Sequence, residues 1–528
     1  MMKSLPRVRA MVGVCAVLAV IASFAVVQPA SAASKKVSFD SNGVLKTGTD
    51  LTAAGGVNLD PISMHPNDYT WAYPITFSLL MLNADGSFSP GFASKVDTPD
   101  ASTIVVTLRP NLVFSNGEKL DAQAAVNSII RTRDSKNTAF RGPEMALLAS
   151  ATVESPTQFT LKLSSPAVGQ YYPLLADAET APVAPESIAV NDKTSRTVIA
   201  AGPFKIDSYT PGTELKLVKN DTFYDAKNVK LAGITYTQIA AAPGTGVTAL
   251  KSGAVDYLPG LSFPDTQALT KPYTVLHNVT DAPYGMFMCP KAGSPLEKLE
   301  VRQALSYATD RNEINKKLYD GESAPSWQVF PADTPRGNPK LVEQYAYNPK
   351  KAKQLLVKAG YPDGFTLSVL EAAAGETTTI DSLVKQQWAK IGVTLEQKPT
   401  TNFAQDFIIN KTADFFNAMM IRPDVTRISR FLLPTSALNP CRHVVPDIEN
   451  LYAQLSALAP DDPARGPLWK QLGKAVNDDA WNVYTVQYIQ SVPYNSDKVG
   501  GLSEKELLQS PIESWVFNPL KVYVKKGA

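Results

Sequence analysis

Residues suited to metal chemistry or acid–base catalysis are few in this chain of 528 residues, which has three histidines and three cysteines. His65, His277 and His443 lie far apart, and none has a second histidine three or four positions away. The chain has no Cys-x-x-Cys, His-Glu-x-x-His or Gly-x-Ser-x-Gly motif, so the short signatures of zinc sites and hydrolases are missing. We expect no structural metal and no cofactor. A metal carried as cargo through His65 or His443 stays an alternative.

Paired carboxylates are the remaining route to catalysis. Asp461-Asp462 and Asp478-Asp479 are adjacent pairs, but neighbouring side chains point apart, whereas glycosidase carboxylates must face one substrate. Solvated helix ends explain these pairs more simply. A secreted hydrolase therefore finds little support in these pairs, although it stays an alternative.

Residues 1–32 resemble an export leader. Lys3, Arg7 and Arg9 precede an apolar run from Met11 to Val27, and Ala30-Ser31-Ala32 forms a small-residue cleavage site. A membrane anchor is the alternative. Without the leader, 48 basic residues face 49 acidic ones, so a near-neutral chain gives no reason to expect a nucleic-acid partner.

The cysteines bear on localisation. Cys15 lies inside the apolar run and not directly after the cleavage site, so we expect a released protein and not a lipoprotein. Cys289 and Cys441 remain after cleavage, and an oxidising compartment allows a disulfide between them. Two buried free thiols are the alternative.

Strand and helix patterns alternate along the chain. Thr103–Leu108 and Thr157–Leu163 predict strands, and Asp121 predicts the N-cap of a helix over 122–131. Asn348-Pro349 predicts the start of another helix, which Gly360 ends before a strand at 365–370. About 500 residues exceed one hydrophobic core, so we expect an α/β protein with two to four domains.

Residues 295–311, PLEKLEVRQALSYATDR, carry the most specific pattern. Val301, Leu305 and Ala308, with Ala304 beside them, predict a helix with one buried face. The sequence of this segment resembles the signature of the peptide-type (family 5) solute-binding proteins of ABC importers. Further segments match that family in order, namely Leu59-Asp60-Pro61, TLRP with FSNG at 107–117, GPF at 202–204 with Tyr209, Pro211-Gly212 and Asn220, LKSGAVD at 250–256, Gly321, NPKKAKQLLVKAG at 348–360 and IGV at 391–393.

The resemblance implies an α/β, periplasmic-binding-protein-like type II fold, with two hinged lobes and an extra inserted domain. Lobe I would comprise 33–75, 198–282 and 486–528, the inserted domain 76–197, and lobe II 283–485. Segments near Thr280–Met288 and Val483–Val492 would cross between the lobes. The resemblance implies a binding protein and not an enzyme, with a secreted sensor on the same scaffold as an alternative. The implied partners are a solute and ABC permease subunits with cytoplasmic ATPases, and we expect a monomer.

The resemblance also implies ligand residues. In the family's peptide binders an aspartate after a tryptophan grips the ligand's amino group, about seven residues before a Phe-Leu pair. Asp424 has that spacing from Phe431-Leu432 and is the expected cation anchor. Pairing with Arg422 or Arg427 is the alternative. Ile421 replaces the tryptophan and the usual Asp-Pro is absent, which leaves peptide specificity open.

Further ligand contacts are expected from the loop after Leu59-Asp60-Pro61, where His65, Pro66 and Asn67 lie, and from aromatic residues. Those aromatics are Tyr284, Tyr484 and Tyr488 in the crossing segments and Trp327 in a loop that faces the cleft in relatives. Core packing is the alternative for each of them. The predicted ligand is a short peptide or peptide-like amine, with a small amide or aromatic compound, a metal chelate or an oligosaccharide as alternatives.

Overall fold

The N-terminal sheet holds four strands in the order β1-β10-β9-β8. They are β1 (Val44–Thr49), β8 (Phe204–Thr210), β9 (Glu214–Lys219) and β10 (Gly233–Gln238). The hairpin between β8 and β9 turns at Pro211-Gly212, where Gly212 has a positive φ of 64°, as the sequence predicts. β1 and β10 are parallel, so their carboxyl ends lie at one edge of the sheet.

A computed structural model describes residues 38–52, 57, 60–63, 69–83, 87–135, 142–189, 198–240, 242–371, 375–420, 422, 424–503 and 518–527. Phe39–Ala528 forms one unit. The expected leader at 1–32 and the loop residues His65, Pro66 and Asn67 lie outside the described residues, so the expectations about them stay predictions.

The middle sheet is antiparallel and has the order β4-β5-β7-β6. Its strands are β4 (Ala93–Asp100), β5 (Thr103–Leu108), β6 (Leu148–Ser155) and β7 (Gln158–Leu163). Helix α2 (Ala122–Asp134) packs on this sheet, and Asp121 caps it by accepting a hydrogen bond from the Ala124 N–H at 3.0 Å. The strand and cap predictions for this region are confirmed.

The five-stranded sheet has the order β13-β12-β14-β11-β15. It contains β12 (Phe365–Glu371), β13 (Val393–Pro399), β14 (Phe415–Met419), β11 (Tyr273–Met288) and β15 (Asn482–Asn495). β12 runs parallel to both β13 and β14, so the carboxyl ends of these three strands share one edge.

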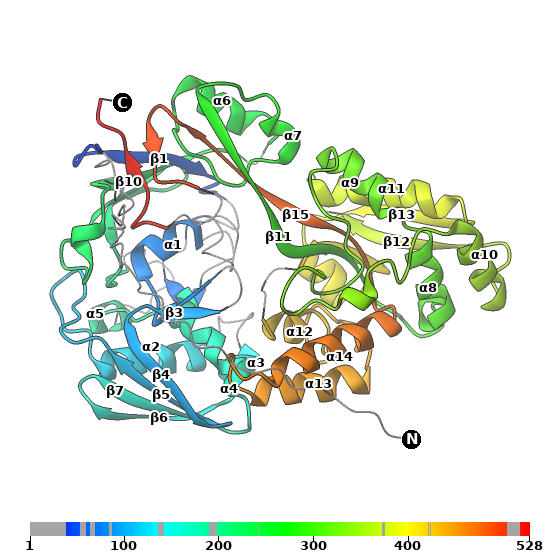
Figure 1. The fold of residues 1–528 in the computed structure, drawn as a ribbon, viewed down its shortest axis with the longest axis horizontal. Coiled ribbons are helices and arrows are strands. Elements are labelled where there is room, and N and C mark those ends of the chain that lie inside the picture. Colours follow the sequence, from blue (N-terminus) through cyan, green and yellow to red (C-terminus); the bar gives the residue numbers. More distant parts are fainter. Residues whose placement is uncertain are drawn as a thin grey trace, which may run out of the picture. The chain divides into compact units, whose positions relative to one another are not determined.

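Strands β11 and β15 form a long antiparallel ribbon that runs from the five-stranded sheet toward helices α6 (Thr245–Ser252) and α7 (Phe263–Thr266) (Figure 1). Within β11, the residues Tyr284–Met288 belong to the five-stranded sheet and pair with β14. The other half meets residues 256–260 through backbone hydrogen bonds from Leu258 N to Pro493 O and from Gly260 N to Ser491 O. The register of the ribbon shifts between Val279 and Gly285, where a hinge is expected.

The signature segment at 295–311 is not one helix. Helix α8 (Leu299–Tyr307) ends early, and Asp310 caps a second helix, α9 (Arg311–Tyr319), by accepting from the Glu313 N–H at 3.0 Å. The predicted buried stripe is confirmed, because its four members are fully buried. Arg302 and Arg311 are buried as well and bind backbone carbonyls, and Arg302 also pairs with Asp479 at 2.7 Å. These arginines hold loops in place.

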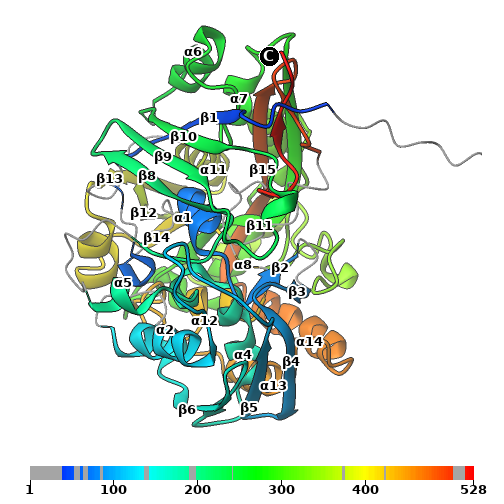
Figure 2. The same cartoon turned by 90° about the vertical axis from the view of Figure 1, so that its left-hand side faces the viewer.

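The other helices surround the three sheets (Figures 1 and 2). They are α1 (Tyr69–Thr76), α3 (Gly142–Met145), α4 (Val168–Tyr171), α5 (Pro185–Ala189), α6 (Thr245–Ser252), α7 (Phe263–Thr266), α10 (Pro349–Lys358), α11 (Glu376–Ala389), α12 (Thr426–Phe431), α13 (Pro446–Ala457) and α14 (Arg465–Asp478). Two-stranded pairs join β2 (Leu80–Leu82) to β3 (Phe88–Pro90) and β16 (Val499–Gly500) to β17 (Tyr523–Val524).

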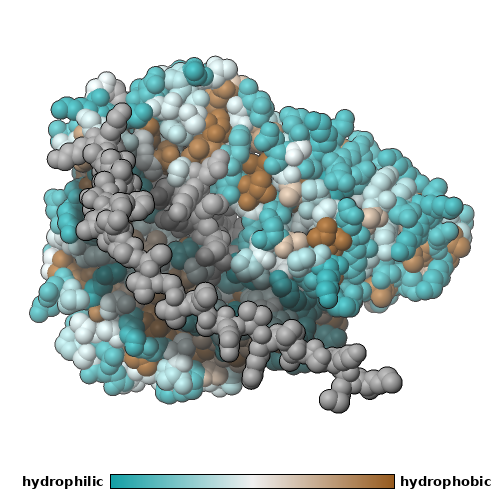
Figure 3. All heavy atoms as spheres, viewed as in Figure 1, coloured by the Kyte–Doolittle hydropathy of each residue, from teal (hydrophilic) through white to brown (hydrophobic). Residues whose placement is uncertain are grey.

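Hydrophilic residues cover most of the described part of the face in Figure 3, and apolar residues form small separate patches there. Among the described helices, each is too short or too polar to cross a bilayer.

Candidate functional site

A pocket of about 700 Å³ lies between the N-terminal sheet and the helices beside the five-stranded sheet. One wall is formed by the end of β1, by the segment that follows β10, by α6 and by the segment that leads into α7. The other wall is formed by Leu318 on α9 and by Gly375, Glu376 and Thr379 at the start of α11. The volume is typical of sites for small molecules. Its place matches the rule that ligands of α/β sheets bind outside the carboxyl ends of parallel strands.

The pocket wall is apolar and acidic. Three carboxylates line it, those of Asp50, Asp265 and Glu376, and none of the described lining residues is Lys, Arg or His. Asp50 Oδ1 accepts from the Thr52 N–H at 2.9 Å and from Gln238 Nε2 at 3.0 Å, which fixes its carboxylate at the end of β1. Such a wall favours a cation attached to an apolar body.

Glu376 is held by two tyrosines. Its Oε2 accepts from the hydroxyl of Tyr284 at 2.7 Å and from that of Tyr319 at 2.6 Å. Burial raises the pKa of Glu376, and these hydrogen bonds partly oppose the rise. The buried ring of Tyr488 packs edge-on against Tyr284, with ring centroids 6.2 Å apart. Tyr284 and Tyr488 of the predicted ligand set therefore come together behind Glu376, and Tyr284 orients its carboxylate.

Asp424 follows β14, and Glu376 follows the neighbouring parallel strand β12, so both lie at the same edge of the five-stranded sheet. The side chain of Asp424 is only 6% exposed. Oδ1 accepts from the N–H of Thr426 at 2.8 Å and from its hydroxyl. Oδ2 is buried and has no hydrogen-bond partner among the described residues. The charge of Asp424 acts on the buried guanidiniums of Arg465 and Arg427, where it opposes the lowering of their pKa by burial, so cations of the protein itself already face this carboxylate. Asp424 is not among the residues that line the pocket.

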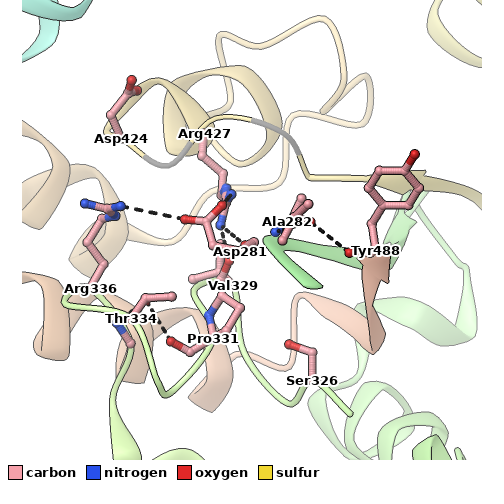
Figure 4. Close-up of polar contacts among 12 residues, drawn as sticks. Asp281, Ala282, Ser326, Val329, Pro331, Thr334, Arg336, Asp424, Arg427 and Tyr488 are labelled. Atoms are coloured by element: carbon pink, nitrogen blue, oxygen red, sulfur yellow. Dashed lines mark hydrogen bonds and ion pairs between the residues drawn. The ribbon is translucent and has the colours of Figure 1, made fainter. Parts of the chain in front are cut away.

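The two neighbouring arginines have other partners. Arg427 donates to Asp281 Oδ1 at 2.9 Å and to the carbonyl of Val329 at 2.9 Å, and Arg336 lies 3.7 Å from Asp281 Oδ2. Figure 4 shows the Asp424 carboxylate pointing away from Arg427 and Asp281. No hydrogen bond or short ion pair joins Asp424 to Arg422 or Arg427 among the described contacts, but the charge of Asp424 acts on Arg427, so both the anchor and the pairing alternative stay predictions.

Arg422 joins two regions of the fold. Both of its terminal nitrogens donate to the carboxylate of Asp177 at 2.8 Å, and both side chains are almost fully buried. Asp177 lies between the short helices at Tyr172–Ala176 and Ala178–Thr180, close in sequence to the middle sheet, whereas Arg422 follows β14. The ion pair therefore fastens the region of the middle sheet to the edge that carries Asp424.

The other predicted aromatics lie away from the pocket lining. Tyr484 is buried in a cluster that includes Phe287 and Phe431. Trp327 is half-buried, and its carbonyl accepts from Asn477 Nδ2 at 2.9 Å. Their ligand roles stay predictions, and the packing of Tyr484 agrees with the core alternative.

Two histidines have structural contacts. His443 Nε2 lies 2.8 Å from Asp479 Oδ2, and its ring packs on Trp481. His277 Nδ1 lies 3.0 Å from Ser491 Oγ. The described residues contain no group of three or more His, Cys, Asp or Glu side chains arranged to hold a metal.

The remaining cysteines are joined. Cys289 at the end of β11 and Cys441 form a disulfide with a Cα–Cα distance of 5.1 Å. Cys289 is fully buried in the same cluster as Tyr484, so the bond ties the segment before α13 to the five-stranded sheet.

Sequence reasoning missed Glu376, Tyr319 and Asp50. A usable signal existed for Glu376, because it comes six residues after the strand predicted at 365–370, and binding residues of α/β folds gather after such strands. Neither tyrosine partner could be found in this way, since they lie 92 and 57 residues from Glu376 along the chain.

The pocket lies at the carboxyl ends of the parallel strands β1 and β10, in a fold that also contains the long ribbon of β11 and β15, and both features are typical of two-lobed solute-binding proteins. Residues 87–424 match the family model of bacterial extracellular solute-binding proteins, family 5 (middle region). The chain belongs to this family.

Curated relatives support the same class. The chain is 23% identical over 303 residues to the glutathione-binding protein GsiB of Salmonella paratyphi A, covering 56% of this chain and 57% of that protein. It is 28% identical over 327 residues to the nickel-binding periplasmic protein of Escherichia coli, covering 59% and 61%. The chain thus spans about three-fifths of the length of these relatives.

The fold is also that of solved binding proteins. The structure resembles the binding protein AgaA from A. tumefaciens R10, solved with agropinic acid, with a TM-score of 0.78 at 22% identity. The match covers 92% of this chain and 99% of AgaA. The predicted type II fold, with two lobes and an inserted domain, is confirmed by this similarity.

Proposed function

We propose that this protein is the extracytoplasmic receptor of an ABC importer and that it captures a short peptide or peptide-like amine between its two lobes. The observation that carries the proposal is the pocket of about 700 Å³, whose lining includes residues from the N-terminal sheet's side and from α9 and α11, which we assign to the two lobes. Closure around a solute would select the form that docks on the permease. The expected leader, the release without a lipid anchor and the monomeric state belong to the same proposal.

The charges of the site support a cationic solute. Three carboxylates line the pocket and favour a positive group. Asp424 does not line the pocket, and its proposed role as a cation anchor rests on its spacing from Phe431-Leu432 and on its place after β14. A peptide with a free terminal carboxylate finds no basic residue in the described pocket lining. A peptide amide or a decarboxylated amine therefore fits the site better than an ordinary peptide.

The relatives' names show how far ligands vary in this family, since one binds glutathione and another nickel. The replacement of the expected tryptophan by Ile421, together with the apolar pocket wall, favours a small amide or aromatic amine as the second candidate. A sensor on the same scaffold would bind equally well, and only an uptake assay with the permease separates the two roles.

Calorimetry tests the cation directly. Trialanine amide and its N-acetyl derivative differ only in the amino group's charge, so the receptor should bind the free amine and not the acetylated form. Asp424→Asn should weaken the binding of the amine by about 2–4 kcal/mol, because the pair is buried. Asp207→Asn, which changes an exposed carboxylate on β8, is the matched control and should bind like the parent. Equal binding of the amine and acetylated forms by the parent would remove the cation from the proposal.

A further inference from the structure

Glu376 contacts elements on both sides of the pocket. It is the first residue of α11 and lines the pocket from there. The backbone of Phe263, on α7 in the opposite wall, acts on the Glu376 carboxylate and lowers its pKa. The ring of Phe263 also packs edge-on against that of Tyr319 on α9, with ring centroids 5.6 Å apart. The Glu376 carboxylate therefore lies where the two walls approach each other.

Two tyrosines hold this carboxylate in one orientation. The hydroxyls of Tyr284 and Tyr319 both donate to the same oxygen, Oε2. Burial and the charge of Glu376 raise the pKa of each tyrosine, so both hydroxyls stay protonated and remain donors. An ionised carboxylate has about four lone-pair sites, so Glu376 can accept further N–H donors from a molecule in the pocket.

The surroundings of Glu376 differ from those of Asp424. Burial, the two tyrosines and the backbone of Phe263 shift the pKa of Glu376, and none of these is a lysine, an arginine or a histidine. The charge of Asp424, in contrast, acts on Arg427 and Arg465. Burial of a carboxylate is costly without a cation, and an ammonium group in the pocket would reduce that cost.

The lining shows how a cation in this pocket would be recognised. None of the described lining residues is Phe, Tyr or Trp. Quaternary ammonium groups are typically bound by cages of aromatic rings, which this lining does not provide. Its larger apolar residues are aliphatic, namely Ile239, Leu258, Leu261 and Leu318, together with Pro243, Pro259 and Pro264. The described lining therefore offers a cation carboxylate acceptors and an aliphatic wall.

We propose that Glu376 binds the cation of the solute and that the pocket selects an ammonium group with N–H donors over a quaternary one. This assignment rests on the proposed function and deepens it, because it names the residue and the class of cation. A primary ammonium group donates up to three hydrogen bonds, whereas a trimethylammonium group donates none. Asp50 and Asp265 line the same pocket and add to its negative charge.

Calorimetry with trialanine amide, its N-acetyl derivative and its N,N,N-trimethyl derivative tests the assignment. The parent should bind the primary amine at least about 30-fold more tightly than the trimethylated form. Glu376→Gln keeps an acceptor oxygen for both tyrosines but removes the charge. It should weaken the primary amine about 30-fold and lose most of the selectivity between the two cations. Glu396→Gln, which changes an exposed carboxylate on β13, is the matched control and should bind like the parent.

The outcomes separate this assignment from the proposed function. Suppose that Glu376→Gln keeps the parent's affinity for the amine while the parent still prefers the amine to its acetylated form. That result would overturn the assignment and leave the proposed function standing, as would a parent that binds the primary and trimethylated amines equally well. A parent that binds none of the three ligands would overturn both.

A second variant covers the case in which Glu376→Gln does not fold by circular dichroism. Glu376→Asp keeps the charge but shortens the side chain, which moves the carboxylate away from the two tyrosine hydroxyls. It should bind the primary amine more weakly than the parent and still prefer it to the trimethylated form. An affinity equal to that of the parent, or a loss of that preference, would contradict the assignment.

Discussion

The buried ion pair between Arg422 and Asp177 predicts a large effect of one substitution. Asp177→Asn removes the negative charge and leaves the guanidinium of Arg422 in a place where its side chain is 0% exposed. Its Nε already has no hydrogen-bond partner among the described residues. Breaking a buried pair by removing one partner costs about 3–5 kcal/mol, because the remaining charge stays out of water.

The protein can respond to the unpaired charge of Arg422 in two ways, and a different measurement detects each response. If the two regions stay together, urea unfolding followed by circular dichroism should show a loss of about 3–5 kcal/mol in the free energy of unfolding. If they separate so that water reaches Arg422, the ligand-free protein should show a larger radius of gyration by small-angle scattering. The double variant Asp177→Leu/Arg422→Met should recover most of the loss, since it leaves no unpaired charge.

The control is an ion pair on the surface. Lys95 and Asp97 lie 2.8 Å apart with side chains 68% and 45% exposed, so Asp97→Asn should change the unfolding free energy by less than about 1 kcal/mol. The reasoning is refuted if Asp177→Asn and Asp97→Asn show the same free energy of unfolding and the same radius of gyration.

Three further predictions concern stability. Burial raises the pKa of Asp381 to about 7, so the folded state holds the carboxyl proton more tightly than the unfolded state does. The protonated carboxyl therefore stabilises the fold fully below about pH 4. This stabilisation, of up to about 4 kcal/mol, is lost as the pH rises to about 7. Asp381→Asn should therefore gain stability over the parent across that range in urea unfolding, and a constant difference would contradict it. Cys441→Ser should lower the free energy of unfolding by about 2–5 kcal/mol, because the disulfide closes a loop of 152 residues. A reductant should lower the free energy of unfolding of the parent by a similar amount and should leave that of the variant unchanged. Asp310→Ala should cost about 1 kcal/mol through loss of the α9 cap, and an unchanged melting temperature would count against that role.

Local rules read from the sequence predicted the elements well. Asp121 and Asn348 cap helices as expected, and the strands at 103–108 and 365–371 lie within a residue of their predicted bounds. The break after Tyr307 was missed, because the apolar stripe continues to Ala308 although Asp310 starts a new helix. A helix cap outweighed the periodicity there.

The site was harder to predict, because its contacts join distant segments. Asp424 followed from spacing within one motif, but the partner of its neighbour Arg422 is Asp177, 245 residues earlier. Glu376 is held by Tyr284 and Tyr319, which lie 92 and 57 residues away. Spacing along the chain shows neither which charges are paired nor which carboxylate oxygens stay free.

Native mass spectrometry of the freshly purified protein tests the central claim most directly. The account predicts an adduct of a few hundred daltons, in keeping with the pocket of about 700 Å³, whose mass identifies a solute with a basic nitrogen and which is lost in Asp424→Asn. A solute without a basic nitrogen, or one that remains equally bound in Asp424→Asn, would contradict it.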